Sequence, residues 1–200
     1  MKLVLATGNA GKQREFAALL APAGIEVLLQ GALGVASVEE TGSTFEANAL
    51  LKARHAARST GLAALADDSG IEVDALGGRP GVYSARYAGP DASDADNNAL
   101  LLRELQSVPA AQRTARYRCV LALVRTADEP EPLLVQGSWA GRIGFEPRGR
   151  NGFGYDPYFI PDGLACTAAE LPVAEKNRLS HRALALAALL AHPRFPGARP

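Results

Sequence analysis

The sequence is poor in the residues that mark disulfide-stabilised and zinc-binding proteins. Only two of its 200 residues are cysteines, Cys119 and Cys166, and three are histidines. Two cysteines provide no disulfide framework, and neither lies with histidines at the spacing of a zinc site. We expect both to be small buried side chains in a reducing compartment, which favours a cytoplasmic location.

Net charge and long hydrophobic runs are also missing. The 21 basic and 21 acidic residues give a formal net charge of zero, whereas a nucleic-acid-binding protein normally carries a basic excess. The longest apolar run, Ala183 to Ala191, is half of the roughly 18 residues that suggest a membrane span. The apolar stretch after Met1 is too short for a secretory signal. We therefore expect no nucleic-acid partner and no membrane association.

What the sequence does contain is the pattern of a globular α/β protein. It is 48% hydrophobic and 21% charged, and a chain of this length can bury enough surface for a core. Apolar runs that stop at turn residues alternate with segments of helical spacing. Because no linker or repeat interrupts the pattern, we expect one two-lobed domain over residues 1–192 and a frayed tail over 193–200.

Turn residues and capping residues set the expected elements. The predicted strands are residues 2–7, 62–66, 114–125 and 133–145. The predicted helices run over 12–20, from the Ser43–Glu46 capping box to about Ser59, from an Asp94 cap to about Gln106, over 172–179, and from a Ser180 cap to Pro193. Residues 151–161 contain too many helix breakers for a regular helix.

The first candidate site is the turn between the first strand and the first helix. It consists of Thr7, Gly8, Asn9, Ala10, Gly11 and Lys12. Backbone N–H groups and the helix dipole at such a turn favour phosphate, and Lys12 adds a positive charge. The turn is not a Walker A loop, because Gln13 stands where that motif has its metal-binding hydroxyl. A tight turn with a solvent-facing lysine is the alternative interpretation.

The second candidate is acidic. Asp67, Asp68 and Ser69 follow an apolar run, and the carboxyl ends of strands are where open α/β sheets place ligands. Two adjacent aspartates on an extended segment point to opposite sides, so only one can face a given site. The Glu39–Glu40 pair can supply a second carboxylate for Mg²⁺, which needs one or two alongside phosphates and water. Ordinary surface acids in a turn are the alternative.

The third candidate combines aromatic and basic residues. Phe153 and Tyr155 lie between glycines and can form a platform for a flat base. Lys176, His181 and Arg182 can donate hydrogen bonds to a base carbonyl. Core packing of the aromatic residues and a solvated first helical turn are the alternatives.

Together these segments resemble the inosine triphosphate pyrophosphatase family, also called dITP/XTP pyrophosphatases. The resemblance covers nearly the whole chain, in order, through Leu5–Lys12, Glu39–Gly42, Thr44–Phe45, Asn48–Ala49, Lys52–Ala53, Ala66–Gly70, Pro80–Gly89, Gly152–Pro157, Glu175–Asn177 and Ser180–Arg182. One departure is Ala47, because the family usually has Glu immediately before the Asn of the helix motif.

The resemblance implies an α/β homodimer whose elongated mixed β-sheet is flanked by helices, with two lobes around a central active-site cleft. It also implies Mg²⁺-dependent hydrolysis of ITP, dITP and XTP to the monophosphate and pyrophosphate, which cleanses the nucleotide pool before DNA or RNA synthesis. By resemblance, Glu39 and Asp68 hold one Mg²⁺ per subunit, Asp68 is the general base, and Ser69 contacts substrate.

The resemblance also divides the substrate between two groups of residues. The triphosphate would lie on Thr7, Gly8, Asn9, Ala10, Gly11 and Lys12, with Lys52 adding a further positive charge. The base would lie on Phe153, Gly154, Tyr155, Asp156, Lys176, His181 and Arg182.

Three other functions stay open. A nucleotide-sensing protein would keep the pocket without turnover, and a related pyrophosphatase would act on modified pyrimidine nucleotides. An RNA-binding module is suggested by the arginines at 113, 116 and 118, but the zero net charge disfavours it.

Overall fold

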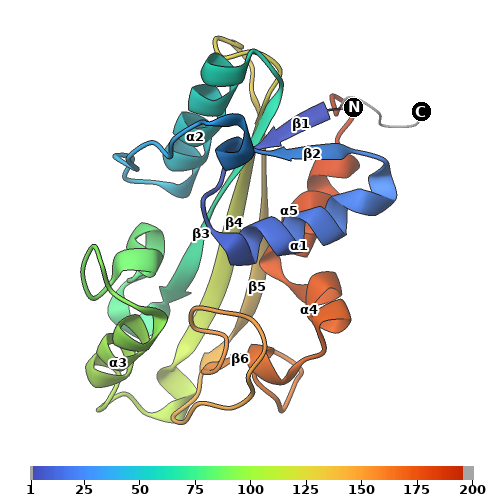
Figure 1. Ribbon diagram of the computed structural model, residues 1–200. Coiled ribbons are helices and arrows are strands. Elements are labelled where there is room, and N and C mark those ends of the chain that lie inside the picture. The colour runs from blue at the N-terminus through green and yellow to red at the C-terminus, as the bar shows by residue number, and fades with distance from the viewer. Residues whose placement is uncertain (1, 196–200) are drawn as a thin grey trace. The chain divides into compact units, whose positions relative to one another are not determined.

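The computed structural model describes residues 2–195 as a mixed α/β protein (Figure 1). Within these residues one six-stranded sheet has the order β2-β1-β3-β4-β5-β6. The strands are β1 (Lys2–Leu5), β2 (Glu26–Leu29), β3 (Ala64–Val73), β4 (Thr114–Val124), β5 (Leu133–Ile143) and β6 (Phe159–Pro161). β1 pairs in parallel with both β2 and β3, whereas β5 and β6 are antiparallel. The predicted mixed α/β fold is confirmed.

The helices lie close to their predicted positions. They are α1 (Ala10–Leu20), α2 (Phe45–Thr60), α3 (Asp94–Glu104), α4 (Val173–Leu179) and α5 (His181–Leu190). Two predicted caps are wrong by one residue. Thr44 caps α2, because its hydroxyl accepts the N–H of Ala47 at 3.1 Å. Ser93 caps α3, in a capping box with Asp96.

The third strand is longer than the sequence predicts. Its predicted end at Ala66 is wrong, because β3 continues through both aspartates to Val73. The Asp-Asp-Ser-Gly composition is typical of a turn, but Asp67 and Asp68 both pair with lysines instead of water. Tertiary charge pairing therefore overrides the local turn preference.

The chain divides into two compact units. The first contains residues 1–68, 119–137 and 182–200, and the second contains 69–118 and 138–181. β3, β4 and β5 each contribute residues to both units. The two-lobed arrangement around a cleft stays a prediction.

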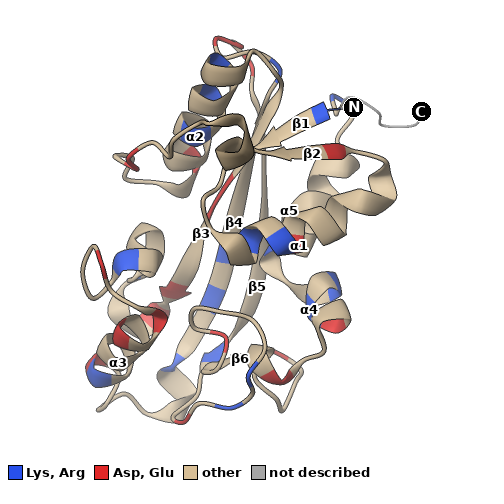
Figure 2. Ribbon diagram, viewed as in Figure 1, with Lys and Arg blue, Asp and Glu red and all other residues tan. Residues whose placement is uncertain are grey.

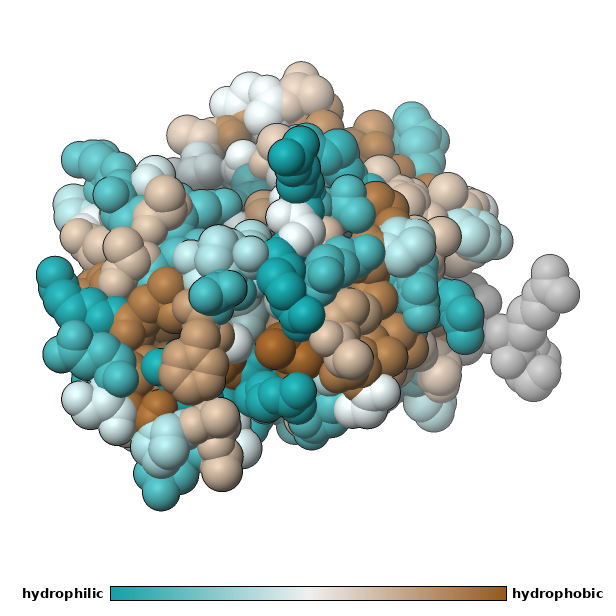
Figure 3. Space-filling view, turned by 90° about the horizontal axis from the view of Figure 1, so that it is seen from below, coloured by the Kyte–Doolittle hydropathy of each residue, from teal (hydrophilic) through white to brown (hydrophobic). Residues whose placement is uncertain are grey.

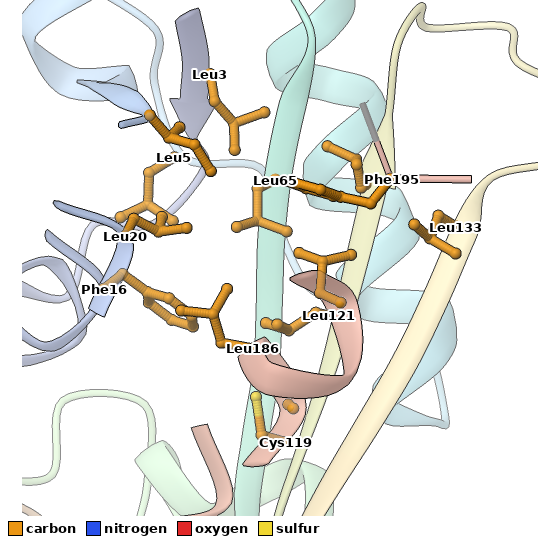
Figure 4. Close-up of a cluster of buried hydrophobic side chains, with 14 residues drawn as sticks. Leu3, Leu5, Phe16, Leu20, Leu65, Cys119, Leu121, Leu133, Leu186 and Phe195 are labelled. Carbon is orange, nitrogen blue, oxygen red and sulfur yellow. The ribbon is translucent and has the colours of Figure 1, made fainter. Parts of the chain in front are cut away.

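The core of the first unit is aliphatic, with two phenylalanines (Figure 4). Its buried side chains include Leu3, Leu5, Phe16, Leu20, Leu65, Leu121, Leu133, Leu186, Leu189 and Phe195. Phe195 belongs to the segment 193–200 that is predicted to fray, yet it is only 6% exposed. Burial of its ring in this core accounts for the difference. Residues 196–200 of that segment lie outside the described residues.

The core of the second unit is more aromatic. Tyr117 and Trp139 each meet the ring of Phe159 edge-on, with centroid distances of 4.7 and 5.4 Å. Leu101 and Leu105 attach α3 and the turn after it to the same core. This cluster supports the aromatic segment from which one candidate site is built.

The surface is chemically mixed. On the face shown in Figure 3, hydrophilic residues surround smaller hydrophobic patches. Among the described residues, no helix combines the length and the apolar character needed to cross a bilayer.

The residue after Ser69 has no room for a side chain. A Cβ at Gly70 would overlap the carbonyl oxygen of Gly81 and the hydroxyl of Ser84. We expect Gly70→Ala to lower the free energy of unfolding by about 3 kcal/mol, as overpacking does. Gly31→Ala is the control, since its Cβ would meet no described atom within 4 Å. Urea unfolding measures both, and equal stabilities would contradict the close approach.

Candidate active site

The turn between β1 and α1 has the geometry of a helix N-terminus open to solvent. Asn9 caps α1, because its Oδ1 accepts the N–H of Lys12 at 3.1 Å. Thr7 holds the turn through its hydroxyl and its carbonyl, which accept from Asn9 N–H and from Gln13 Nε2. Residues 8–10 are exposed. The predicted strand–turn–helix is confirmed, and its backbone is accessible to an anion.

Asp67 is fully buried and paired with two cations. Its Oδ2 lies 2.9 Å from Lys12 Nζ and 3.7 Å from Arg182 Nε. Arg182 Nη1 also donates to Glu15 Oε2 at 2.7 Å. Burial alone would raise the pKa of Asp67, but Lys12 and Arg182 hold that pKa well below its ordinary value. Asp67 is therefore ionised, and it fixes two of the predicted substrate-binding side chains.

Asp68 has a different set of partners, as alternation along a strand requires. Asn48 Nδ2 donates to its Oδ2 at 3.2 Å, and Lys52 Nζ donates to its Oδ1 at 2.9 Å. Burial raises the pKa of Asp68, Lys52 opposes that rise, and nearby Glu40 adds to it, so the pKa lies above its ordinary value. A carboxylate with a raised pKa is a better proton acceptor.

Lys52 connects Asp68 to one of the two adjacent glutamates. Its Nζ lies 2.6 Å from Glu40 Oε1, whereas Glu39 is exposed. Burial lowers the pKa of Lys52, but Asp68, Asp67 and Glu40 together raise it above its ordinary value. Figure 2 shows this alternation of charge, with acidic residues on β3 and basic residues on α1 and α2. Glu40 therefore lies beside Lys52 and Asp68, and the metal role of Glu39 stays a prediction.

In the second unit, Asp156 is the centre of the aromatic segment. It is 3% exposed, and it accepts from Lys176 Nζ at 2.6 Å, Tyr117 Oη at 3.2 Å and Phe153 N–H at 2.9 Å. Lys176 Nζ also lies 5.2 Å from the centroid of the half-buried Phe153 ring. Tyr155 is instead a core residue, and its hydroxyl donates to Ser84 O at 2.8 Å. Phe153 is therefore the ring that reaches the surface.

His181 and Arg182, which are adjacent in the sequence, contact different residues. His181 is buried and stacks on Tyr117 in the second unit, with ring centroids 4.6 Å apart. Arg182 pairs with Glu15 and Asp67 in the first unit. The structure thus groups His181 with Lys176 and Asp156, and Arg182 with Lys12. Ser69 is half-buried on β3.

Sequence reasoning missed several contributors. Glu15 was not singled out, although it lies near Lys12 on α1, nor was the interior ring of Tyr117. Asn48 was also missed, although it lies four residues before Lys52 on α2, a spacing that places both side chains on one face. Among residues 2–195, no three His, Cys, Asp or Glu side chains gather as a metal site. Glu40 and Asp68 both contact the ammonium group of Lys52.

These features define an α/β protein whose parallel strands lead into paired carboxylates and cations beside a helix N-terminus. The chain belongs to the Ham1 family, whose model matches residues 3–192. The resemblance found in the sequence is confirmed.

Similar proteins match along almost their whole length. The chain is 58% identical over 188 residues to the dITP/XTP pyrophosphatase of Methylococcus capsulatus, covering 94% of each chain. It is 60% identical over 193 residues to that of Burkholderia pseudomallei, covering 95% of this chain and 92% of the relative. The solved HAM1 protein from Coxiella burnetii has a TM-score of 0.87 at 48% identity, covering 94% of this chain and 96% of that one.

The buried Lys12–Asp67 pair generates a pH-dependent prediction. Lys12→Met leaves Asp67 buried with less positive charge, so we expect a loss of about 3 kcal/mol of stability at pH 7. Because the pKa of Asp67 is lowered on folding, the pair's contribution exists above about pH 4 and is lost as the pH falls. The difference between variant and wild type should therefore shrink from pH 7 to pH 3.5.

Urea unfolding at each pH measures this difference. Lys2→Met is the matched control, since Lys2 forms an exposed pair with Glu26 at 3.8 Å. Its effect should stay below about 0.5 kcal/mol at every pH. If the effect of Lys12→Met does not change with pH, the conclusion that Lys12 stabilises an ionised Asp67 is contradicted.

Proposed function

We propose that this chain is a nucleoside triphosphate pyrophosphatase that acts on deaminated purine nucleotides. It hydrolyses ITP, dITP and XTP to the monophosphate and pyrophosphate. The observation that carries the proposal is that the carboxylates of Asp68 and Glu40 both contact one ammonium group, that of Lys52. Relatives named dITP/XTP pyrophosphatase, similar over nearly the full length, support it.

The exposed N-terminus of α1 binds the triphosphate in this proposal. Its residues are Thr7, Gly8, Asn9, Ala10, Gly11 and Lys12. Backbone N–H groups and the helix dipole stabilise phosphate there. Lys12, with Lys52, neutralises charge that develops on the departing pyrophosphate.

The carboxylates fit Mg²⁺. Asp68 Oδ1 and Glu40 Oε1 both lie within 2.9 Å of the same ammonium nitrogen, so they converge on one centre of positive charge. Oxygen ligands of this kind, with phosphates and water, are what Mg²⁺ prefers, and the bound ion would polarise the phosphate. Asp68 accepts the proton of the attacking water, and Ser69, beside it on β3, contacts substrate.

By the family resemblance, Lys176, His181 and Arg182 recognise the base. Hypoxanthine and xanthine carry an oxygen at C6, which accepts hydrogen bonds from Lys176, His181 or Arg182. Adenine has an amino group there, and a donor facing a donor is costly. Phe153 stacks on the base, while Gly154, Tyr155 and Asp156 shape the loop around it.

The finer features of the proposal rest on the family resemblance. They are a homodimer with one Mg²⁺ per subunit, a cytoplasmic location, and removal of non-standard nucleotides before polymerases use them. The substrate is a small molecule, with no nucleic-acid or membrane partner.

A substrate panel tests the function directly. The protein is incubated with Mg²⁺ and ITP, dITP, XTP, ATP, GTP or a modified pyrimidine triphosphate, and pyrophosphate is assayed separately from phosphate. We expect pyrophosphate from ITP and XTP, with kcat/KM for ATP lower by up to about 10⁴-fold. Binding without turnover would favour a nucleotide sensor, and preference for the pyrimidine would favour the related pyrophosphatase.

Asp68→Asn tests the general base. It keeps the shape of the side chain but cannot accept the proton, so kcat for ITP should fall by about 10²–10⁴-fold. Asp128→Asn is the control, since that side chain is 91% exposed, and its kcat should match the wild type. Circular dichroism checks that both variants fold. Retention of full activity by Asp68→Asn would contradict the role.

The two glutamates are separated by a matched pair of variants. Glu39 is the metal ligand by the family resemblance, whereas Glu40 is the glutamate that shares Lys52 with Asp68. If Glu40 holds the ion, Glu40→Gln should weaken binding of Mn²⁺, a spectroscopic substitute for Mg²⁺, by about tenfold. Glu39→Gln should change it less than twofold. Electron paramagnetic resonance of free Mn²⁺ measures both without turnover. The reverse order would assign the metal to Glu39, as the resemblance implies.

A further inference from the structure

Two side chains of α3 bind the same backbone residue of the aromatic loop, residues 152–156. Asp94 Oδ2 accepts the N–H of Gly154 at 2.6 Å. Asn98 Nδ2 donates to the carbonyl oxygen of Gly154 at 2.9 Å. Asp94 and Asn98 are four residues apart and so lie on one face of the helix. Both hydrogen-bonding groups of Gly154 are therefore held by a single element.

Side-chain hydrogen bonds contribute to the position of the loop. Its residues form turns and bends rather than a strand or helix. Gly152 and Gly154 have φ of +77° and +63°, and glycine has the widest conformational freedom of any residue. Within the loop, the Asp156 carboxylate holds Phe153 N–H. The bonds from α3 supply the fixed point next to Phe153.

Asn98 is oriented for this contact. It is 7% exposed, and its Nδ2 also donates to the carbonyl of Asp94 at 2.7 Å. The opposite orientation of the amide would place its oxygen against two carbonyl oxygens. When Nδ2 donates to these two carbonyl groups, the buried Oδ1 of Asn98 has no hydrogen-bond partner among the described residues. Burying an oxygen without a hydrogen bond is unfavourable. Core packing does not explain why an amide occupies this position, whereas the bond from Asn98 to Gly154 does.

The helix that carries both residues is itself fixed. Ser93 and Asp96 form its capping box, and Leu101 is fully buried in the core of the second unit. Asn97, the neighbour of Asn98, bonds instead to the turn at 85–88, through Ala88 N–H at 2.8 Å and the carbonyl of Ala85 at 3.2 Å. Movement of Gly154 relative to the core is therefore limited through Asp94 and Asn98.

We propose that Asp94 and Asn98 are positioning residues that clamp Gly154 and thereby set the affinity for the nucleotide base. Gly154 directly follows Phe153, whose ring lies 5.2 Å from Lys176 Nζ. Loosening Gly154 lets that ring move away from the ammonium group, which weakens the base site and leaves the phosphate site of α1 unchanged. The inference rests on the proposed function only in assigning the base to this loop.

The test measures binding with two probes, IMP for the base site and inorganic tripolyphosphate for the phosphate site. Asp94→Ala and Asn98→Asp each remove one bond to Gly154, and we expect each to raise the Kd for IMP about tenfold. The Kd for tripolyphosphate should change less than twofold. Asp94→Asn keeps an acceptor oxygen and should restore the wild-type Kd for IMP. Calorimetry with Mg²⁺ measures all of these values.

Asn97→Asp is the matched control, because it makes the same change at the next buried position of α3 but faces the 85–88 turn. It should leave the Kd for IMP within twofold of the wild type. Hydrogen exchange of the Gly154 amide, read by NMR, confirms that Asp94→Ala opens the clamp.

The outcomes separate the two hypotheses. Faster exchange at Gly154 with an unchanged Kd for IMP overturns the proposal, as does equal weakening of IMP and tripolyphosphate. A clamp effect on IMP in a wild-type protein that releases no pyrophosphate from ITP supports the clamp and contradicts the proposed function. A wild-type protein that binds no IMP contradicts the clamp proposal, whereas the substrate panel decides the proposed function.

Discussion

The neutralisation of two buried carboxylates is the constraint on which the first unit depends. Asp67 requires Lys12 from α1 and Arg182 from α5, and Asp68 requires Lys52 from α2. A buried carboxylate without such a partner is strongly unfavourable. β3 can therefore carry two adjacent aspartates only where three helices deliver cations to it. The charges that stabilise this part of the fold are also those that the proposed function uses.

Among the described residues, local signals predicted the five α-helices and four of the six strands, but not β2 and β6. Long-range contacts explain other differences. The turn after β1 and the stop of α2 at Gly61, in the left-handed region at φ +69°, follow from residues adjacent in sequence. The length of β3 does not, because its turn-like composition is overridden by lysines from α1 and α2. Phe195 likewise lies in a proline-rich segment that predicts no helix or strand, and only the core around it makes its burial favourable.

The segments of the candidate site were predictable, but the partners within them were not. Glu39 and Glu40 are adjacent in a loop without periodicity, so only Lys52 distinguishes them. His181 and Arg182 form the start of α5, where the cationic Arg182 opposes the helix dipole. Contacts with other elements explain why these two residues stand there. Arg182 pairs with Glu15 and Asp67, and His181 stacks on Tyr117.

The ion pairs also affect how a negatively charged substrate would bind. Lys12, Lys52 and Lys176 each lie within 2.9 Å of a carboxylate oxygen, so their ammonium groups are held in place before any ligand arrives. Fixed charges of this kind stabilise a transition state without reorganising at the moment of reaction. A triphosphate with its metal would exchange partners with these groups instead of adding unpaired charge to the interior. The lysine–carboxylate ion pairs thus weaken the electrostatic attraction for an anion, but they also fix the positions of the groups that bind it.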